Sequence, residues 1–151
     1  MQHTLSPGDT LLDAWLSLTS TLWNTRLVSS MSYHECHILG ILLRRLPDAL
    51  PQTATDLIAR TRLLKSQMNK VLTTLEGKGF ITRERAQSDR RMVYIHLTSE
   101  GKTAYLQEHA HIEALLQKVI DRVGAENAMR VAGDLSQITG ILDELLDGAG
   151  A

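Results

Sequence analysis

The stretch RAQSDRRMVYIHLTSEG, residues 85–101, has the pattern of a β-hairpin. Its segment MVYIHL alternates in polarity and is rich in β-branched and aromatic residues, which is typical of a half-buried strand. The preceding GFITRERA has similar strand character, and the polar segment QSDRR separates the two runs. The sequence therefore predicts a hairpin whose tip carries Asp89, Arg90 and Arg91. Adjacent arginines at such a tip are either simply solvated or placed to meet a negative partner.

Two helical segments precede the hairpin. TATDLIARTR predicts a short helix with Asp56 in or near its first turn, and LLKSQMNKVLTTLEGKG predicts a second helix stopped by Gly77 and Gly79. A short helix, a tight turn and a second helix with a polar face form a helix-turn-helix, to which the hairpin adds a wing. In the second helix we expect these apolar residues to face inward: Leu64, Met68, Val71, Leu72 and Leu75.

Further helices are expected on both sides of this unit. Residues 11–28 carry two adjoining apolar stripes, which predicts a helix buried on more than one side. MSYHECHILGILLRRL follows, with Ser32 as its N-cap. After the hairpin, a long helix is expected to end at Gly124. One face of the Ser32 helix is predicted to hold Cys36, Leu39, Leu43 and Leu46.

The last helix has a heptad-like seam, which suits packing against another helix. Its apolar residues recur in steps of three and four: Ala128, Val131, Leu135, Ile138, Leu142 and Leu145.

Length and composition favour one globular domain in the cytoplasm. The chain has 151 residues, of which 43% are hydrophobic and 22% charged. No apolar run reaches the ~20 residues that a membrane span needs, and the first ten residues lack the pattern of a secretory signal. The single cysteine, Cys36, cannot form an internal disulfide, which is consistent with a reducing compartment.

Charge is distributed unevenly along the chain. The formal net charge is −1, but residues 60–91 hold nine Lys or Arg and three acids. This segment therefore carries +6 and the remainder −7. A basic island on an acidic frame is the electrostatic footprint of a protein that binds a polyanion. The alternative is an ordinary solvated surface with uneven charge.

The segment DRRMVYIHLTSEG resembles the wing signature Asp-x-Arg…Leu-Thr-x-x-Gly of the MarR family of bacterial transcription regulators. LTTLEGKGFITR resembles the segment that joins the family's recognition helix to its wing, and the layout of the flanking helices is similar too. One departure is Leu64, where a polar N-cap would be expected at the start of the recognition helix; Ser66 is an alternative cap for a shorter helix. The residues that match the signature are Asp89, Arg91, Leu97, Thr98 and Gly101.

The resemblance implies a mainly α fold with a small β-hairpin. It implies a single domain over 1–151, with a winged helix-turn-helix at about 32–98 and dimerisation helices at about 10–30 and 100–147. It further implies a homodimer that binds a palindromic operator on double-stranded DNA, and we expect a repressor released by a small ligand. A winged-helix module that binds protein instead of DNA is the alternative, because a fold alone does not define function.

The second helix of a helix-turn-helix enters the major groove, and a wing arginine suits the flanking backbone or minor groove. Asn and Gln side chains read adenine, whereas Lys reaches guanine or phosphate. Asp89 is expected to shape the wing, because its charge would repel phosphate. The predicted DNA contacts are Lys65, Ser66, Gln67, Asn69, Lys70, Thr73, Arg90 and Arg91.

A second set of residues suggests a sensor. Imidazole and thiolate are zinc ligands, but no pair here has the tight spacing of a zinc-finger motif. Packing of these side chains, zinc binding and oxidation of the thiol remain alternatives, and we expect an organic effector with no resident metal or cofactor. Nothing around the cysteine predicts a strained nucleophile turn, so we expect no enzyme. The candidate pocket residues are His34, Cys36, His37, His109 and His111.

Overall fold

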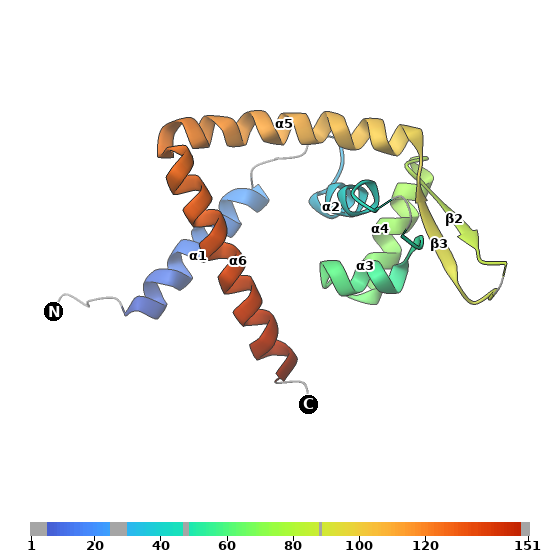
Figure 1. The fold of residues 1–151 in the computed structure, drawn as a ribbon, viewed down its shortest axis with the longest axis horizontal. Helices are drawn as coiled ribbons and strands as arrows, with labels where there is room; N and C mark the ends of the chain where they lie inside the picture. Colours follow the sequence, from blue (N-terminus) through green and yellow to red (C-terminus); the bar gives the residue numbers. More distant parts are fainter. Residues whose placement is uncertain (1–5, 25–29, 47–48, 88, 149–151) are drawn as a thin grey trace. The chain divides into compact units, whose positions relative to one another are not determined.

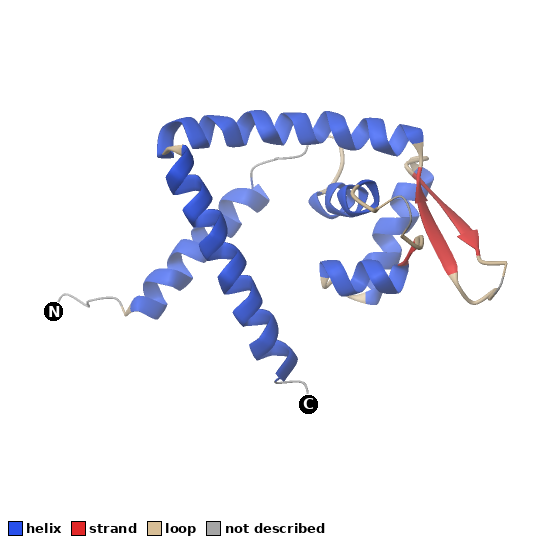
Figure 2. Ribbon diagram, in the orientation of Figure 1, coloured by secondary structure: helices blue, strands red, loops and turns tan. Residues whose placement is uncertain are grey.

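The computed structural model describes residues 6–24, 30–46, 49–87 and 89–148 (Figure 1). It comprises two compact units, residues 1–111 and 112–151. A mainly helical fold with one small antiparallel sheet confirms the predicted fold class (Figure 2). The elements are α1 (Pro7–Asn24), α2 (Tyr33–Leu43), β1 (Gln52–Thr53), α3 (Ala54–Thr61), α4 (Lys65–Gly77), β2 (Ile81–Arg85), β3 (Val93–Leu97), α5 (Ser99–Val123) and α6 (Ala125–Gly148).

The core of the first unit lies among α2, α3, α4 and the sheet. Figure 1 shows α3 and α4 next to each other, with the β2–β3 hairpin extending beyond them. Burying one such apolar side chain contributes about 1.5–3 kcal/mol, so this cluster is a main stabilising element of the unit. The largest fully buried side chains are Ile38, Leu39, Leu57, Met68, Leu72, Leu75 and Ile81.

Three helices of this unit begin with a reciprocal capping box, which at the start of α1 pairs Ser6 with Asp9. The Ser32 hydroxyl accepts a hydrogen bond from the Glu35 amide at 3.2 Å, and the Glu35 carboxylate accepts one from the Ser32 amide at 2.9 Å. Thr53 and Asp56 form the same pair at the start of α3. Each box satisfies amide groups that a helix start leaves without partners. The predicted N-cap at Ser32 and the place of Asp56 in the first turn are confirmed.

The sheet has three strands in the order β1-β3-β2, whereas the sequence predicted two. The predicted hairpin pairs β2 with β3, in a register that places Arg83 opposite Ile95. The additional strand, β1, pairs with the other edge of β3, with Gln52 opposite Ile95. A two-residue strand has too few positions to show an alternating pattern, so periodicity does not reveal it.

Three predictions at helix ends were wrong. Leu46 does not share the apolar face of α2, because that helix ends at Leu43, and Leu46 is 73% exposed. Leu64 does not face inward: it is the N-cap of α4 and is 67% exposed. Ser66 does not cap a shorter helix, since α4 already begins at Lys65.

The remaining helices agree with the predicted breaks. α5 ends at Val123, directly before the predicted break at Gly124, whose φ of +86° is open to glycine at little cost and strained for other residues. α1 ends at Asn24, and residues 25–28 of the helix predicted there lie outside the described residues. Across the described ranges, no helix combines the length and apolarity needed to cross a lipid bilayer.

Candidate nucleic-acid interface

The outer face of α4 is polar and open to solvent. Met68, Leu72 and Leu75 turn into the core, with exposures of 0–1%. The remaining side chains of the helix are thereby directed outward, as the amphipathic pattern requires. The six residues of α4 that the sequence predicted as DNA contacts are all exposed: Lys65, Ser66, Gln67, Asn69, Lys70 and Thr73.

The first turn of α4 has an unusual cap. Leu64 occupies the N-cap and its side chain makes no capping hydrogen bond. Instead, the Gln67 side-chain oxygen accepts a hydrogen bond from the Leu64 amide at 3.0 Å. This contact supplies half of a capping box. It also occupies one acceptor site of an amide that would need its oxygen and its nitrogen to read adenine bidentately.

The last turn of α4 is held from several directions. Gly79, at φ +72°, and Phe80 donate backbone hydrogen bonds to Glu76 and Leu75, which is a Schellman motif. The Thr98 hydroxyl donates to the Gly79 carbonyl at 2.7 Å. The end of α4 is therefore fixed both by its own backbone and by the residue that precedes α5.

The Thr and Gly of the Leu-Thr-x-x-Gly signature connect α5 to this turn. The Thr98 hydroxyl accepts a hydrogen bond from the Gly101 amide at 3.0 Å, and the Thr98 amide donates to the Phe80 carbonyl at 3.1 Å. A Cβ on Gly101 would lie 2.1 Å from the Phe80 carbonyl oxygen. Glycine is therefore required there because the backbones of two segments come into direct contact.

The wing turn is ordered by backbone contacts. The Asp89 carboxylate accepts a hydrogen bond from the Arg91 amide at 2.9 Å, and the Asp89 carbonyl accepts one from the Met92 amide at 2.9 Å. Ala86 donates to the Met92 carbonyl and so closes the base of the turn. The side chains of Arg90 and Arg91 are exposed. The acid thus bonds to the turn and the two cations face solvent.

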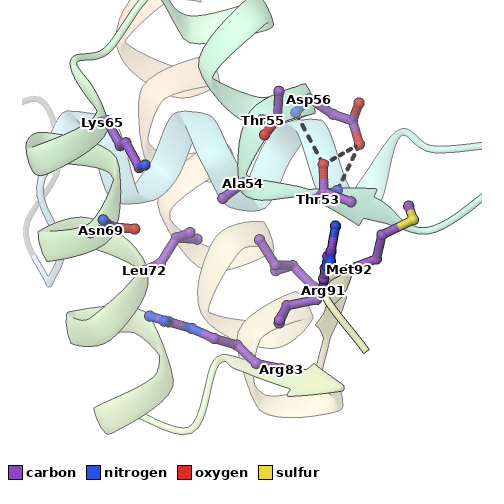
Figure 3. A pocket seen from close by; sticks show the side chains of 12 residues that line it. Thr53, Ala54, Thr55, Asp56, Lys65, Asn69, Leu72, Arg83, Arg91 and Met92 are labelled. Carbon is purple, nitrogen blue, oxygen red and sulfur yellow. Dashed lines mark hydrogen bonds between the residues drawn. The ribbon is translucent and has the colours of Figure 1, made fainter. Parts of the chain in front are cut away.

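A cavity of about 690 Å³ lies between α4, the start of α3 and the base of the wing. Figure 3 shows Lys65 and Asn69 of α4 and Arg83 of β2 turned toward this space. Arg91 lines it from the wing side, while the acidic side chain in the lining, Asp56, is already bonded to Thr53. The lining is therefore electropositive and suited to an anionic group.

Arg83 is a site residue that the sequence analysis did not single out. Its guanidinium donates to the Thr73 hydroxyl at 3.2 Å and lies 3.4 Å from a Glu76 carboxylate oxygen. Arg83 shares a strand face with the buried Ile81, because alternate side chains of a strand lie on the same side of the sheet. Its membership of the basic island was the signal that could have identified it.

The sensor candidates occupy different environments. Cys36 is buried, and burial, aided by the charge of Glu108, raises the pKa of its thiol. Burial, aided by Arg44, lowers the pKa of His37. These shifts favour a neutral thiol and a neutral imidazole at neutral pH.

The histidines contact aromatic rings. The Tyr33 ring lies 5.8 Å from that of His34 and 6.0 Å from that of His37. His109 stacks on Tyr105 with 5.4 Å between ring centroids. His111 is exposed on α5. Within the described part of the chain, no three His, Cys, Asp or Glu side chains are grouped closely enough to hold a metal ion.

A helix-turn-helix with an exposed polar second helix and a cationic wing is the architecture of a DNA-binding regulator. A family model for the MarR family matches residues 29–92. The HTH-type transcriptional regulator YwhA of Bacillus subtilis is 30% identical over 112 residues, which are 73% of this chain and 81% of that protein. The chain therefore belongs to the MarR family, which confirms the family predicted from the sequence.

The named relatives are regulators rather than enzymes. The homoprotocatechuate degradative operon repressor of Escherichia coli is 27% identical over 105 residues, 70% of this chain. The chain spans 62–66% of the length of this repressor and of another regulator that it matches.

Solved structures share the fold. The PcaV transcriptional regulator of Streptomyces coelicolor, in complex with its natural ligand, superposes with a TM-score of 0.72 at 18% identity, covering 93% of this chain and 96% of that one. The MepR–DNA complex of S. aureus gives a TM-score of 0.69 at 17% identity, covering 90% and 98%.

Proposed function

We propose that this protein is a homodimeric, sequence-specific DNA-binding repressor. The observation that carries the proposal is the electropositive cavity between α4 and the wing, lined by Lys65, Arg83 and Arg91. Asn69 stands in the same lining and presents an amide able to read a base edge. In this arrangement α4 enters the major groove while the wing arginine reaches the flanking backbone or minor groove.

Exposed apolar residues on the terminal helices support the dimer. Leu11 and Leu12 of α1 are 53% and 55% exposed, and Leu145 and Leu146 of α6 are 65% and 67% exposed. Large apolar side chains exposed on a helix in this way are typical of an interface. We call the winged helix-turn-helix of each protomer its reading head. Because the two reading heads of a dimer are related by a two-fold axis, the operator is palindromic, with half-sites about one helical turn apart.

Selection from random duplexes tests DNA binding directly. We expect the protein to enrich one palindrome and to protect it in a footprint of the intergenic region upstream of its own gene. Affinity should fall steeply with salt, because several cations displace counterions from phosphates. Enrichment of no sequence, with no salt-dependent binding to any duplex, would favour a module that binds protein instead.

A small organic ligand is the proposed release signal. The PcaV structure holds its natural ligand in a similar fold. The raised pKa of Cys36 argues against thiol oxidation, since the thiolate is the reactive form. His34, Cys36 and His37 on α2 are the proposed pocket residues, with His109 or His111 contributed by α5.

Operator titrations separate the three signals. Zinc control requires that a chelator change the affinity and that His37→Ala abolish the change. Thiol control requires that peroxide release the DNA and that Cys36→Ser resist it. We expect neither treatment to alter affinity, which leaves the organic ligand. A tenfold change with chelator that is lost in His37→Ala would instead assign the histidines to a metal.

A further inference from the structure

Two carboxylates of the first unit are buried, although the DNA-binding surface does not use them. Glu35 is 5% exposed and Glu108 is 3% exposed. A buried carboxylate is unfavourable unless hydrogen bonds and opposite charge compensate it. The partners of these two residues therefore show which segments they hold together.

Glu35 links the start of α2 to the end of the recognition helix α4. One of its oxygens accepts hydrogen bonds from the Ser32 amide at 2.9 Å and from the Lys78 ammonium at 2.8 Å. Lys78 is the C-cap of α4. Its side chain is 35% exposed and that of Glu35 only 7%, so the pair is partly shielded from water.

Glu108 links α5 to the same lysine through Ser30. One Glu108 oxygen accepts hydrogen bonds from the Ser30 amide at 2.8 Å and from the Ser30 hydroxyl at 2.5 Å. The Ser30 carbonyl in turn accepts a hydrogen bond from the Lys78 ammonium at 3.5 Å. A polar path thus runs from α5 through Ser30 and Lys78 to Glu35 on α2.

The two ends of α4 are held very differently. At its first turn, the exposed Gln67–Leu64 contact replaces a side-chain cap. At its last turn, Thr98 and the polar path through Lys78 bind three consecutive residues, 78–80, to neighbouring segments. The polar contacts that tie the recognition helix to α2 and α5 are therefore concentrated at its C-terminal end, in addition to its core packing.

We propose that Lys78, Glu35 and Glu108 are positioning residues that fix the angle of α4 against α2 and α5. They thereby set the half-site spacing that the dimer accepts. This inference rests on the proposed function, because spacing has a meaning only for a dimer on a palindrome. None of the three residues needs to touch DNA for this role.

The test uses the palindrome selected by the parent protein and two derivatives, with one base pair inserted or deleted at the dyad. One base pair moves a half-site by ~3.4 Å and rotates it by ~35°. The main variant is the double substitution Lys78→Met with Glu35→Gln, which removes both charges and so leaves no unpaired buried carboxylate. Lys102→Met, at an exposed position on α5, removes one positive charge without touching the path.

We expect the double variant to lose about 2- to 30-fold in affinity for the correctly spaced operator, the range that such couplings span. Its affinity for the two operators with altered spacing should fall less. The ratio of its affinities for the correct and the altered spacings should therefore decrease. Lys102→Met should weaken all three duplexes together.

Glu108 gives a second pair of variants. Glu108→Gln retains an oxygen that accepts hydrogen bonds from Ser30, so it should keep the parental ratio of affinities between operator spacings. Glu108→Leu has no such oxygen and should decrease this ratio. The inference is overturned if the double variant and Glu108→Leu both keep the parental ratio of affinities while sedimentation shows intact dimers. The proposed function is unaffected by that outcome. A parent protein that selects no duplex would overturn the proposed function and this inference with it.

Discussion

Leucines of the helix-turn-helix and leucines of the terminal helices have opposite exposures. Leu39 and Leu57, in α2 and α3, are fully buried. Leu11 of α1 and Leu135 of α6 are 53% and 47% exposed. Both groups follow helical periodicity in the sequence, so the pattern alone does not distinguish them. The first group is buried within the first unit, whereas the second belongs to the surface that we propose for the dimer.

The largest effect is expected from charges placed on α6. Leu135→Glu combined with Leu142→Glu should give monomers or insoluble protein, because carboxylates would enter the proposed dimer interface unpaired. Sedimentation velocity measures the assembly state. Since a two-fold operator requires two heads, DNA binding should be lost with the dimer.

Gln137→Glu is the matched control, because residue 137 is turned about 200° from Leu135 around the helix. It should leave both the dimer and DNA binding unchanged. A double glutamate variant that remains a folded, DNA-binding dimer would show that the exposed leucines of α6 are not the interface.

The next effect concerns the stability of the head. Gly101→Ala should destabilise it by about 1–3 kcal/mol or more, because the added Cβ would overlap the Phe80 carbonyl. Gly77→Ala is the control, since a Cβ on this last residue of α4 meets no atom within 4 Å. Urea unfolding measures both variants. Equal stability of Gly101→Ala and the parent would mean that the backbones at Gly101 and Phe80 separate at no cost.

Much of the head was predictable because its signals are local. Ser32 with Glu35, and Gly79, mark helix ends in the first unit through short-range chemistry. β1 was not predictable, since two residues acquire strand character only by pairing with β3. The error at Leu64 has a similar origin: its place in the apolar pattern suggested burial, but the tight turn after α3 makes it a cap.

The site shows the same division. Periodicity predicted which side chains of α4 point outward, and these residues are exposed. The role of Arg83 depends on contacts across the sheet with Thr73 and Glu76, which no linear pattern encodes. The polar path from Glu108 to Lys78 is likewise tertiary, since its members are up to 78 residues apart.

Within the reading head, Asn69 should determine sequence preference. Asn69→Ala should reduce discrimination at one base pair of each half-site by ~1–3 kcal/mol if the amide contacts adenine bidentately. Thr74→Ala is the control, because the Thr74 hydroxyl is already bonded to the Lys70 carbonyl. Binding to a library of single-base operator variants measures the change. An unchanged preference at every position would remove Asn69 from the readout.

The wing should contribute affinity without sequence preference. Arg91→Ala should weaken binding to operator and to unrelated DNA together, and lower the salt slope by about one unit for one lost phosphate-type contact. Arg122→Ala, in the last turn of α5, removes the same charge from a residue that belongs to neither α4 nor the wing, and should leave the slope unchanged. Equal operator affinity of Arg91→Ala and the parent at moderate salt would contradict the wing assignment.

The smallest effect is expected at Gln67, where stability and DNA binding should change in opposite directions. Gln67→Glu keeps an acceptor for the Leu64 amide and places a negative charge at the start of α4, so stability should be unchanged or raised by less than ~1 kcal/mol. The same carboxylate has no donor for a base and is repelled by phosphate, so DNA affinity should fall.

Gln67→Met loses both functions and should reduce both stability and affinity. Urea unfolding beside operator titration separates the two roles. If Gln67→Met is as stable as the parent, the Gln67 side chain does not contribute to the cap of α4, and its amide oxygen is free to read DNA.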